Sequence, residues 1–342
     1  MRIAIISKLW EETSPYSVGG TGVAVGILAD ELVKRGHTVT LFATGDSKTE
    51  AKLVSVREKP WGNAYSEPIE YLHIAEAFSR SQEFDIIDCH VEEKACFFAD
   101  LTLVPTLINV TYGEFGDERR IFERYKHLNY VAISHALKQE LPLLNWKGVI
   151  YHGINTELFS YNEHPEQYLL FLGRVSPQKG PHIAINIACT LNKKLIIAGK
   201  MSDADKPYLD THVLPFIDGK QIQYVGIADF KTKNELYKNA SALLHPIQYL
   251  EAFGLTIIEA MACGTPVISF DNGAPKEIIQ DAKTGFIVTT EEQMAEAVLR
   301  LDTISRARCR ERIQQHFTVE QMVDEYEKMY TLVINSSNHE RK

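Results

Sequence analysis

Cysteine is scarce in this sequence and forms no pattern. The 342 residues include five cysteines, and no two of them make a C-x-x-C pair. This spacing argues against a disulfide framework or a zinc site and favours a reducing compartment. Long apolar runs are lacking too: none approaches the ~18 residues of a membrane span, and the N-terminal apolar stretch is too short for a signal peptide. We therefore expect a cytoplasmic protein in which the N-x-S/T sequons are chance matches.

An excess of basic residues is also missing. Thirty-six Lys and Arg stand against 45 Asp and Glu, which gives a net charge of -9 and argues against nucleic acid as the main partner. The 45% hydrophobic content, with 20 Gly and 13 Pro, is ordinary for a globular protein. The length predicts two domains of roughly 150 residues each.

Short β-branched runs alternate with amphipathic stretches, which predicts an α/β protein with parallel sheets covered by helices. The expected strands of the first half are 3–6, 38–42, 85–88, 106–110, 130–133 and 149–151. After a polar segment at 155–167 the alternation resumes, with expected strands at 168–172, 194–198, 222–225, 242–245, 266–270 and 285–288. Two doubly wound domains, 1–155 and 156–317, follow. Because such sheets bind ligands beyond the carboxyl ends of their strands, two of them facing each other would form a cleft.

The first glycine-rich loop is SPYSVGGTG, between the first strand and a helix. Gly19, Gly20 and Gly22 would let the backbone approach a phosphate or sugar, and the helix start beyond them offers free N–H groups. A flexible surface loop is one alternative. A nicotinamide site is another, but the spacing is not G-x-G-x-x-G and the loop is too long for that turn.

Two cations follow the first strand of the second half. In FLGRVSPQKG, Arg174 and Lys179 leave the strand end five residues apart, and such a pair suits a diphosphate, with the Arg as a planar fork and the Lys as a point charge. Two solvated loop cations are the alternative.

The segment EAFGLTIIE places an acid at each end of an apolar stretch. It follows the expected strand 242–245, with Glu251 in the loop and Glu259 near the start of the next helix. Carboxylates can accept hydrogen bonds from sugar hydroxyls, and the helix amides between them can hold a phosphate. Alternatively, Glu251 is a solvated acid and Glu259 complements the helix dipole.

These three features in this order, with the continuation MACGTPVISFDNGAPKEIIQDAKTGFIV, resemble the retaining glycosyltransferases of family four. The resemblance covers nearly the whole chain and is strongest over 168–288. It implies the GT-B fold, two Rossmann-like doubly wound domains facing across a cleft. Because FTVEQMVDEYEKMY resembles the family's C-terminal helix, it also implies that a helix at about 318–334 crosses back onto the first domain.

The resemblance implies roles residue by residue. Arg174 and Lys179 match the pair that contacts the donor diphosphate. Glu251 matches the acid near hydroxyls of the donor sugar, and Glu259 the acid that holds the nucleotide ribose. The other implied donor-binding positions are the loop residues Gly19 and Gly20, the base-contacting turn at Gly226 and Ile227, and Phe253, Gly254 and Leu255, whose amides approach the phosphate and sugar.

One position departs from the family pattern. Many members have a His at the end of the fourth strand, where this chain has Tyr112. A tyrosine hydroxyl can bind a sugar, but a pKa of about 10 makes it a poor base near neutrality. His90, after the third expected strand, is a second candidate for the same space, with a purely structural role as the alternative. His152 and Asn155 also differ from the family's usual hinge residues.

Two further motifs have simple interpretations. Asp203-Ala-Asp205 has the spacing of a metal-binding D-x-D motif, but we interpret it as turn and cap chemistry. The segment 116–128 carries Arg119, Arg120, Arg124 and Lys126, which could contact an anionic lipid or a phosphorylated acceptor. Because acids interleave with these bases, a solvated face is the favoured interpretation.

The implied reaction moves a sugar from a nucleoside-diphosphate donor, such as a UDP- or GDP-sugar, to a hydroxyl of a saccharide, a lipid-linked or a small-molecule acceptor. The anomeric configuration would be retained, and neither a metal nor a cofactor is expected. A nucleotide-sugar epimerase of the same architecture is one alternative, and a non-catalytic nucleotide-sugar binding subunit is another. An NAD dehydrogenase would need a dinucleotide fingerprint that the sequence lacks.

Overall fold

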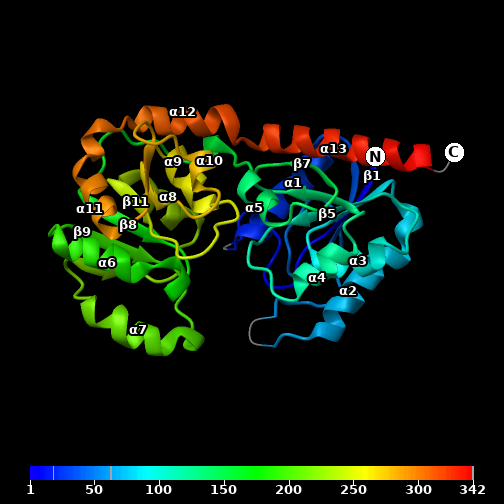
Figure 1. Cartoon of the computed structure of the whole chain (residues 1–342), viewed down its shortest axis with the longest axis horizontal. Coiled ribbons are helices and arrows are strands. Elements are labelled where there is room, and N and C mark those ends of the chain that lie inside the picture. Colours follow the sequence, from blue (N-terminus) through cyan, green and yellow to red (C-terminus); the bar gives the residue numbers. More distant parts are fainter. Residues whose placement is uncertain (18, 62–63, 341–342) are drawn as a thin grey trace. The chain divides into compact units, whose positions relative to one another are not determined.

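The computed structural model describes residues 1–17, 19–61 and 64–340, and the chain divides into two compact units (Figure 1). Unit 1 comprises Met1–Gly153 and Val319–Lys342, and unit 2 comprises Ile154–Thr318. Each unit is built around its own parallel sheet.

The sheet of unit 1 has seven strands in the described residues, in the order β3-β2-β1-β4-β5-β6-β7, and every pairing is parallel. The strand order reverses between β1 and β4, the doubly wound arrangement. Because such strands are covered on both faces, they are apolar along their length. The strands are β1 (Arg2–Ile6), β2 (Thr38–Phe42), β3 (Lys52–Val54), β4 (Ile86–Cys89), β5 (Thr106–Val110), β6 (Asn129–Ala132) and β7 (Trp146–Val149).

Helices cover both faces of this sheet, with α1 and α13 on one face and α2, α3 and α4 on the other (Figure 1). The core beneath α1 and α13 joins residues from the start, the middle and the end of the chain. Gly36, with a φ of +86°, ends α1 in the left-handed conformation. The helices are α1 (Gly20–Lys34), α2 (Glu67–Ser79), α3 (Glu93–Ala99), α4 (Glu118–Arg124), α5 (His135–Glu140) and α13 (Val319–Glu340).

Unit 2 repeats the arrangement with six described strands in the order β10-β9-β8-β11-β12-β13. Its order reverses between β8 and β11. The strands are β8 (Tyr168–Leu172), β9 (Lys194–Ala198), β10 (Ile222–Tyr224), β11 (Ala242–His245), β12 (Val267–Phe270) and β13 (Gly285–Val288). The helices are α6 (Pro181–Thr190), α7 (Lys206–His212), α8 (Phe230–Asn239), α9 (Leu255–Ala262), α10 (Pro275–Ile278), α11 (Glu291–Leu299) and α12 (Arg306–His316).

Two strand predictions need correction. The last strand of unit 1 was expected at 149–151 but spans Trp146–Val149, because its pairing with β6 begins at Tyr130 and Trp146. Trp146 also donates its ring N–H to the carbonyl of Leu141, which fixes the start of the strand. β3 was not predicted at all, since three residues at the edge of a sheet carry too short an apolar pattern.

Candidate active site

The candidate donor residues of unit 2 follow β8 and β11, the neighbours between which the strand order reverses. Sheets of this kind bind ligands beyond the carboxyl ends of such strands. Arg174 and Lys179 lie in the segment after β8, and Glu251 lies in the loop after β11. The topology therefore brings together segments that are about 70 residues apart in sequence.

Lys179 and Glu251 contact each other directly. Lys179 Nζ lies 2.9 Å from Glu251 Oε2, and both side chains are largely buried. The two loops are also joined through their backbones, because Gln248 N–H donates to the carbonyl of Gln178 at 2.8 Å. Gly180 permits this approach: it has a φ of +71°, and a Cβ there would collide with the carbonyl oxygen of Pro246.

The opposite charges of Glu251 and Lys179 shift the pKa of each side chain toward its ionised form. Burial alone would raise the pKa of Glu251, yet a hydrogen bond from His245 and the charge of Lys179 lower it to about 2. Burial would lower the pKa of Lys179, but Glu251 and Tyr249 raise it above the ordinary value. Glu251 is thus an anion and Lys179 a cation near neutrality.

Two neighbours of Glu251 were not predicted from the sequence. His245 ends β11, with Nε2 3.5 Å from Glu251 Oε2 and Nδ1 2.9 Å from Ser269 Oγ. Gly273 has a φ of +92°, and a Cβ there would lie 2.5 Å from the carbonyl oxygen of Glu251. In the sequence, the position of His245 at the end of a strand could have indicated a functional residue. The glycine in D-N-G-A-P could have indicated that two backbone segments come close together.

Arg174 has a different hydrogen-bond partner. Its side chain is exposed, and Nη2 donates to Gln178 Oε1 at 3.0 Å. The guanidinium therefore keeps most of its five donors in solvent.

The start of α9 lies between the two acids of EAFGLTIIE. Gly254 caps the helix with a φ of +105°, and a Cβ there would lie 2.7 Å from Ile257 Cδ1. The N–H groups of Leu255 and Thr256 have no acceptor among the residues that the structure describes. Phe253 is buried, with its ring 6.1 Å from that of Phe317. The two amides can receive an anionic ligand.

Glu259 has protein partners of its own. It is 6% exposed, and its carboxylate accepts from Lys233 Nζ at 3.0 Å and from Tyr237 Oη at 2.8 Å. Both partners belong to α8. To bind a ribose, the carboxylate of Glu259 would have to accept hydrogen bonds from the ribose hydroxyls in addition to, or in place of, those from Lys233 and Tyr237. Its role at the ribose therefore stays a prediction.

Gly226 and Ile227 follow β10, next to β9 in the sheet. Gly226 has a φ of +78° and its carbonyl accepts from Gly199 N–H at 2.8 Å. Ile227 is 57% exposed, so its apolar side chain is accessible to a flat partner such as a base.

In unit 1, the glycine-rich loop leads into α1, for which Gly19 is the cap and Gly20 the first residue. A carboxylate of the same chain occupies this helix start: Glu11 Oε1 accepts from Gly22 N–H at 2.5 Å. A Cβ at Gly19 would collide with that carboxyl group. Burial raises the pKa of Glu11, although the Gly22 N–H and Lys8 oppose the rise. Glu11 was not predicted, because no pattern links a loop acid to glycines eight residues away.

His90 follows β4 and is 2% exposed. Its Nε2 lies 3.2 Å from Asp88 Oδ2, and its buried Nδ1 has no hydrogen-bond partner in the described part of the chain. Asp88 also accepts from Tyr330 Oη of α13 at 2.7 Å. His90 thus lies at the edge of a buried polar network that ties β4 to α13.

Tyr112 follows β5 and donates to Glu93 Oε2 at 3.1 Å. Burial, with the negative charges of Glu93 and Glu92, raises its pKa further above the ordinary value, so the hydroxyl is a hydrogen-bond donor rather than a base. Glu92, which was not predicted, has a φ of +46° and is buried against Lys8 Nζ at 2.7 Å. Such strain in a non-glycine residue is costly and is concentrated at functional sites.

Comparison with known proteins identifies the family. Residues 155–316 match the model of glycosyl transferases group 1, and residues 18–158 match that of glycosyltransferase family 4. A D-inositol 3-phosphate glycosyltransferase of Mycobacteroides abscessus is 31% identical over 87% of this chain and 81% of its own length. The chain belongs to the group 1 glycosyltransferases.

Solved structures show the same fold for the glycosyltransferase. A sucrose-phosphate synthase of Thermosynechococcus elongatus superposes with a TM-score of 0.82 at 18% identity, over 98% of this chain and 100% of that one. HepE of Anabaena, in complex with UDP-glucose, superposes with a TM-score of 0.76 at 17% identity, over 97% of this chain and 99% of that one. The α/β GT-B fold expected from the motifs is therefore confirmed.

The remaining motifs of the glycosyltransferase have structural partners. Asp203 to Asp205 form a short 3-10 helix, and Ser202 caps it by accepting from Ala204 N–H. Within residues 1–17, 19–61 and 64–340, no group of three or more His, Cys, Asp or Glu side chains is placed to hold a metal ion. The two acids of the D-x-D motif thus belong to a capped turn.

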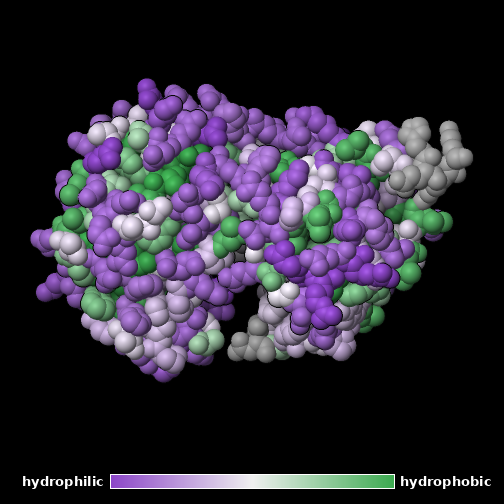
Figure 2. Space-filling view, viewed as in Figure 1, coloured by the Kyte–Doolittle hydropathy of each residue, from purple (hydrophilic) through white to green (hydrophobic). Residues whose placement is uncertain are grey.

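The basic segment of the glycosyltransferase forms α4, whose surface is strongly hydrophilic in Figure 2. Arg119 turns toward the unit and donates to the carbonyl of Glu140 at 2.8 Å, and Arg120 lies 3.9 Å from Asp117. Among the residues that the structure describes, no helix is both long and apolar enough to cross a membrane. Arg120 and its neighbour Asp117 are both strongly exposed, which favours a solvated face.

Proposed function

We propose that the glycosyltransferase takes its sugar from a nucleoside-diphosphate donor held by unit 2. HepE, whose fold this chain shares, was crystallised with UDP-glucose, which favours a uridine diphosphate sugar among the possible donors. The observation that carries the proposal is the contact between Lys179 and Glu251 at the reversal of the strand order. The amides of Leu255 and Thr256 at the start of α9 add to it, since they have no acceptor among the described residues.

This arrangement suits both halves of such a donor. A diphosphate accepts hydrogen bonds, so it would bind Lys179, the exposed Arg174 and the amides of Leu255 and Thr256. A sugar presents hydroxyl donors, which suit the carboxylate of Glu251 because its pKa of about 2 keeps it ionised. Ribose and base would reach Glu259 and the exposed Ile227.

The proposed transfer retains the anomeric configuration. The bond between the anomeric carbon and the diphosphate oxygen breaks, and a bond to the acceptor oxygen forms on the same face. The acceptor's proton passes to the departing phosphate, which becomes the nucleoside diphosphate. Lys179 and Arg174 stabilise the charge that develops on this leaving group. This route needs no protein base, consistent with the raised pKa of Tyr112.

The proposed reaction is independent of metal ions. The two cations and the helix amides would supply the positive field that a divalent ion supplies in other transferases. The acceptor is a saccharide, lipid-linked or small-molecule hydroxyl, which would meet unit 1.

A donor screen tests the proposal. The purified protein would be titrated calorimetrically with UDP, GDP and ADP and with their glucose conjugates, in buffer with and without EDTA. We expect one nucleotide series to bind with or without the chelator, and Lys179→Met to weaken that binding. Loss of binding and turnover in EDTA would overturn the metal-independent proposal.

Product analysis separates the candidate activities. Incubation of the bound donor with a mixture of saccharide acceptors should give a new glycoside of the donor's own anomeric configuration, resolved by NMR. Conversion of the donor without an acceptor would instead indicate an epimerase. Nucleotide binding with no turnover under any condition would indicate a binding subunit.

A further inference from the structure

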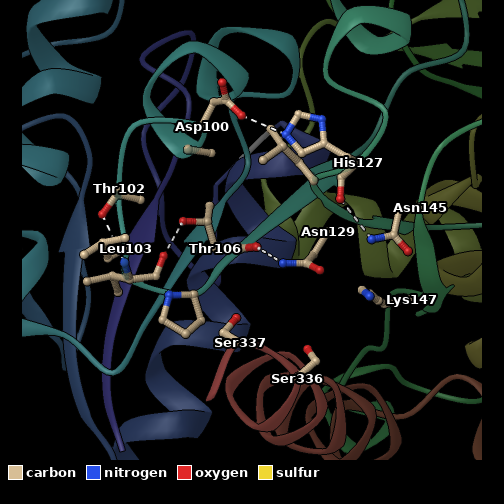
Figure 3. A pocket seen from close by; sticks show the side chains of 14 residues that line it. Asp100, Thr102, Leu103, Thr106, His127, Asn129, Asn145, Lys147, Ser336 and Ser337 are labelled. Atoms are coloured by element: carbon tan, nitrogen blue, oxygen red, sulfur yellow. Dashed lines mark hydrogen bonds and ion pairs between the residues drawn. The ribbon is translucent and has the colours of Figure 1, made fainter. Parts of the chain in front are cut away.

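A hollow of about 400 Å³ lies in unit 1 at the amino ends of β5, β6 and β7. Thr106 and Asn129 are the first residues of β5 and β6, and Lys147 is the second residue of β7. Figure 3 shows Ser336 and Ser337 of α13 across the hollow from these strand ends. Its size is within the range of small-molecule sites.

Each amide side chain at this hollow uses one of its two N–H donors within the protein. Asn129 Nδ2 donates to the carbonyl of Thr106 at 3.1 Å, and Asn145 Nδ2 donates to the carbonyl of His127 at 3.0 Å (Figure 3). These bonds fix the orientation of both side chains. The oxygen Oδ1 and the second N–H of both Asn129 and Asn145 are left without a partner among the described residues.

The other polar groups add to the acceptors. Asp100 Oδ1 is paired with His127 Nε2 at 2.7 Å, which leaves its second oxygen available. Ser336 and Ser337 both donate to the carbonyl of Val333 at 3.0 Å, so their oxygens present lone pairs. The hollow is thus lined by several hydrogen-bond acceptors, with one free N–H of Asn129 and one of Asn145 beside them.

Lys147 adds a positive charge to this lining. No ion pair of its ammonium is found in the part of the chain that the structure describes, where the nearby Asp100 pairs with His127 instead. The ammonium supplies up to three donors. One cation among several acceptors is a poor match for a phosphate, which has only acceptor oxygens at its periphery and would face Asp100 and the amide oxygens. It is a good match for a ligand with many hydroxyl groups, each of which can donate and accept.

We propose that this hollow is a saccharide-binding site separate from the site of sugar transfer. Hydroxyls donate to Asn129, Asn145 and Asp100, and Lys147 donates to one hydroxyl or ring oxygen. Leu103, which is 74% exposed and lines the rim, offers an apolar contact to the C–H face of a sugar ring.

The hollow lies at the opposite end of the sheet from the candidate active-site residue Tyr112. Tyr112 follows the carboxyl end of β5, whereas the hollow lies at the amino end of the same strand. Five residues of strand span about 16 Å, so a saccharide held here does not occupy the reaction edge of the sheet. The site therefore serves to hold a carbohydrate on the enzyme while transfer proceeds elsewhere.

Saturation-transfer NMR on the full chain tests this proposal. The probes are glucose, galactose, mannose and maltotriose, each with and without saturating UDP, and inorganic phosphate as competitor. We expect at least one saccharide to bind in the presence of UDP, with about a tenfold weaker Kd in Asn129→Ala and in Asn145→Ala. Gln82→Ala removes an exposed amide of the same unit away from the hollow and is the matched control. A stronger signal for maltotriose than for its monosaccharide would indicate a glycan chain as the natural occupant.

Three results would overturn the proposal. The first is the absence of a saturation-transfer signal from every saccharide. The second is displacement of the saccharide by phosphate together with a greater loss in Lys147→Ala than in Asn145→Ala. The third is loss of the signal in Tyr112→Phe while Asn145→Ala retains it, which would place the saccharide at the reaction edge. Nucleotide binding, measured in parallel, reports on the proposed function independently, and circular dichroism confirms that each variant is folded.

Discussion

Lys179 Nζ and Glu251 Oε2 lie 2.9 Å apart, although 72 residues separate them in the sequence. Lys179 was predicted to bind the diphosphate of the donor and Glu251 its sugar. In the structure, the two side chains balance each other's charge. A diphosphate that binds Lys179 therefore competes with Glu251 for the ammonium. His245 is placed to keep the carboxylate paired when that exchange occurs.

Removal of the ammonium should impair transfer more than folding. We expect Lys179→Met to lower kcat/KM by about 10²- to 10³-fold, the usual cost of losing one preorganised donor at a developing negative charge. Lys220→Met, at an exposed position of the same unit, is the control. Steady-state kinetics would measure the effect, and an unchanged kcat/KM would contradict a role for Lys179 at the diphosphate.

Glu251 should make stability depend on pH in the acid range. Its pKa falls from an ordinary 4.5 to about 2 on folding, which corresponds to about 3 kcal/mol. Since the folded pKa is the lower one, this stability is complete above pH 4.5 and is lost as the pH falls toward 2. Urea unfolding should show Glu251→Gln to be less stable at pH 7, with the difference shrinking toward pH 2. A stability difference that stays the same from pH 7 to pH 2 would contradict this origin.

Glu11 should have the opposite effect. Burial raises its pKa in the folded state, so the ionised form costs stability at pH values above that raised pKa. Glu11→Gln keeps an oxygen for the Gly22 N–H and should be at least as stable at pH 7. The gain should disappear as the pH falls and Glu11 takes up its proton. Thermal unfolding at several pH values would reveal this, and a less stable variant at pH 7 would argue that the charge itself holds the start of α1.

Removal of one member of the buried pair Lys233 and Glu259 should lower the free energy of unfolding. Both residues are buried and lie 3.0 Å apart, so Lys233→Met leaves an unpaired carboxylate and should cost about 3–5 kcal/mol of unfolding free energy. The double variant Lys233→Met with Glu259→Gln should recover part of that loss. Additive losses in a denaturant double-mutant cycle would show that the pair is not coupled.

The strands were predictable where burial makes them uniformly apolar. The predicted bounds of β2, β5, β8, β9, β11 and β13 match the structure, because a strand covered on both faces reads as one apolar run between turn residues. The edge strand β3 and the start of β7 were not predictable, since there backbone pairing decides the structure and the side chains carry no pattern.

Some residues of the candidate site could likewise be predicted from the sequence, and others could not. Arg174, Lys179 and Glu251 could be found because strand-end position and a family motif coincide at each of them. Glu11 could not, because it acts through one contact that depends on how a loop folds. The position of His245 at a strand end was visible in the sequence, but its contact with Glu251 was not. The partners of Glu259 on α8 were missed for the same reason, since helix periodicity does not indicate which acid a buried Lys233 will meet.

Because the chain leaves unit 1 and later returns to it, the two units are completed in a fixed order during synthesis. Val323, Tyr326 and Tyr330 of α13 lie in the core of unit 1, but a ribosome makes them only after the whole of unit 2. Because domains emerge from the ribosome in sequence, unit 2 can complete its core first. Until the last residues appear, the apolar surface beneath α13 is exposed to water, so the first part of the protein to be made is the last part to be finished.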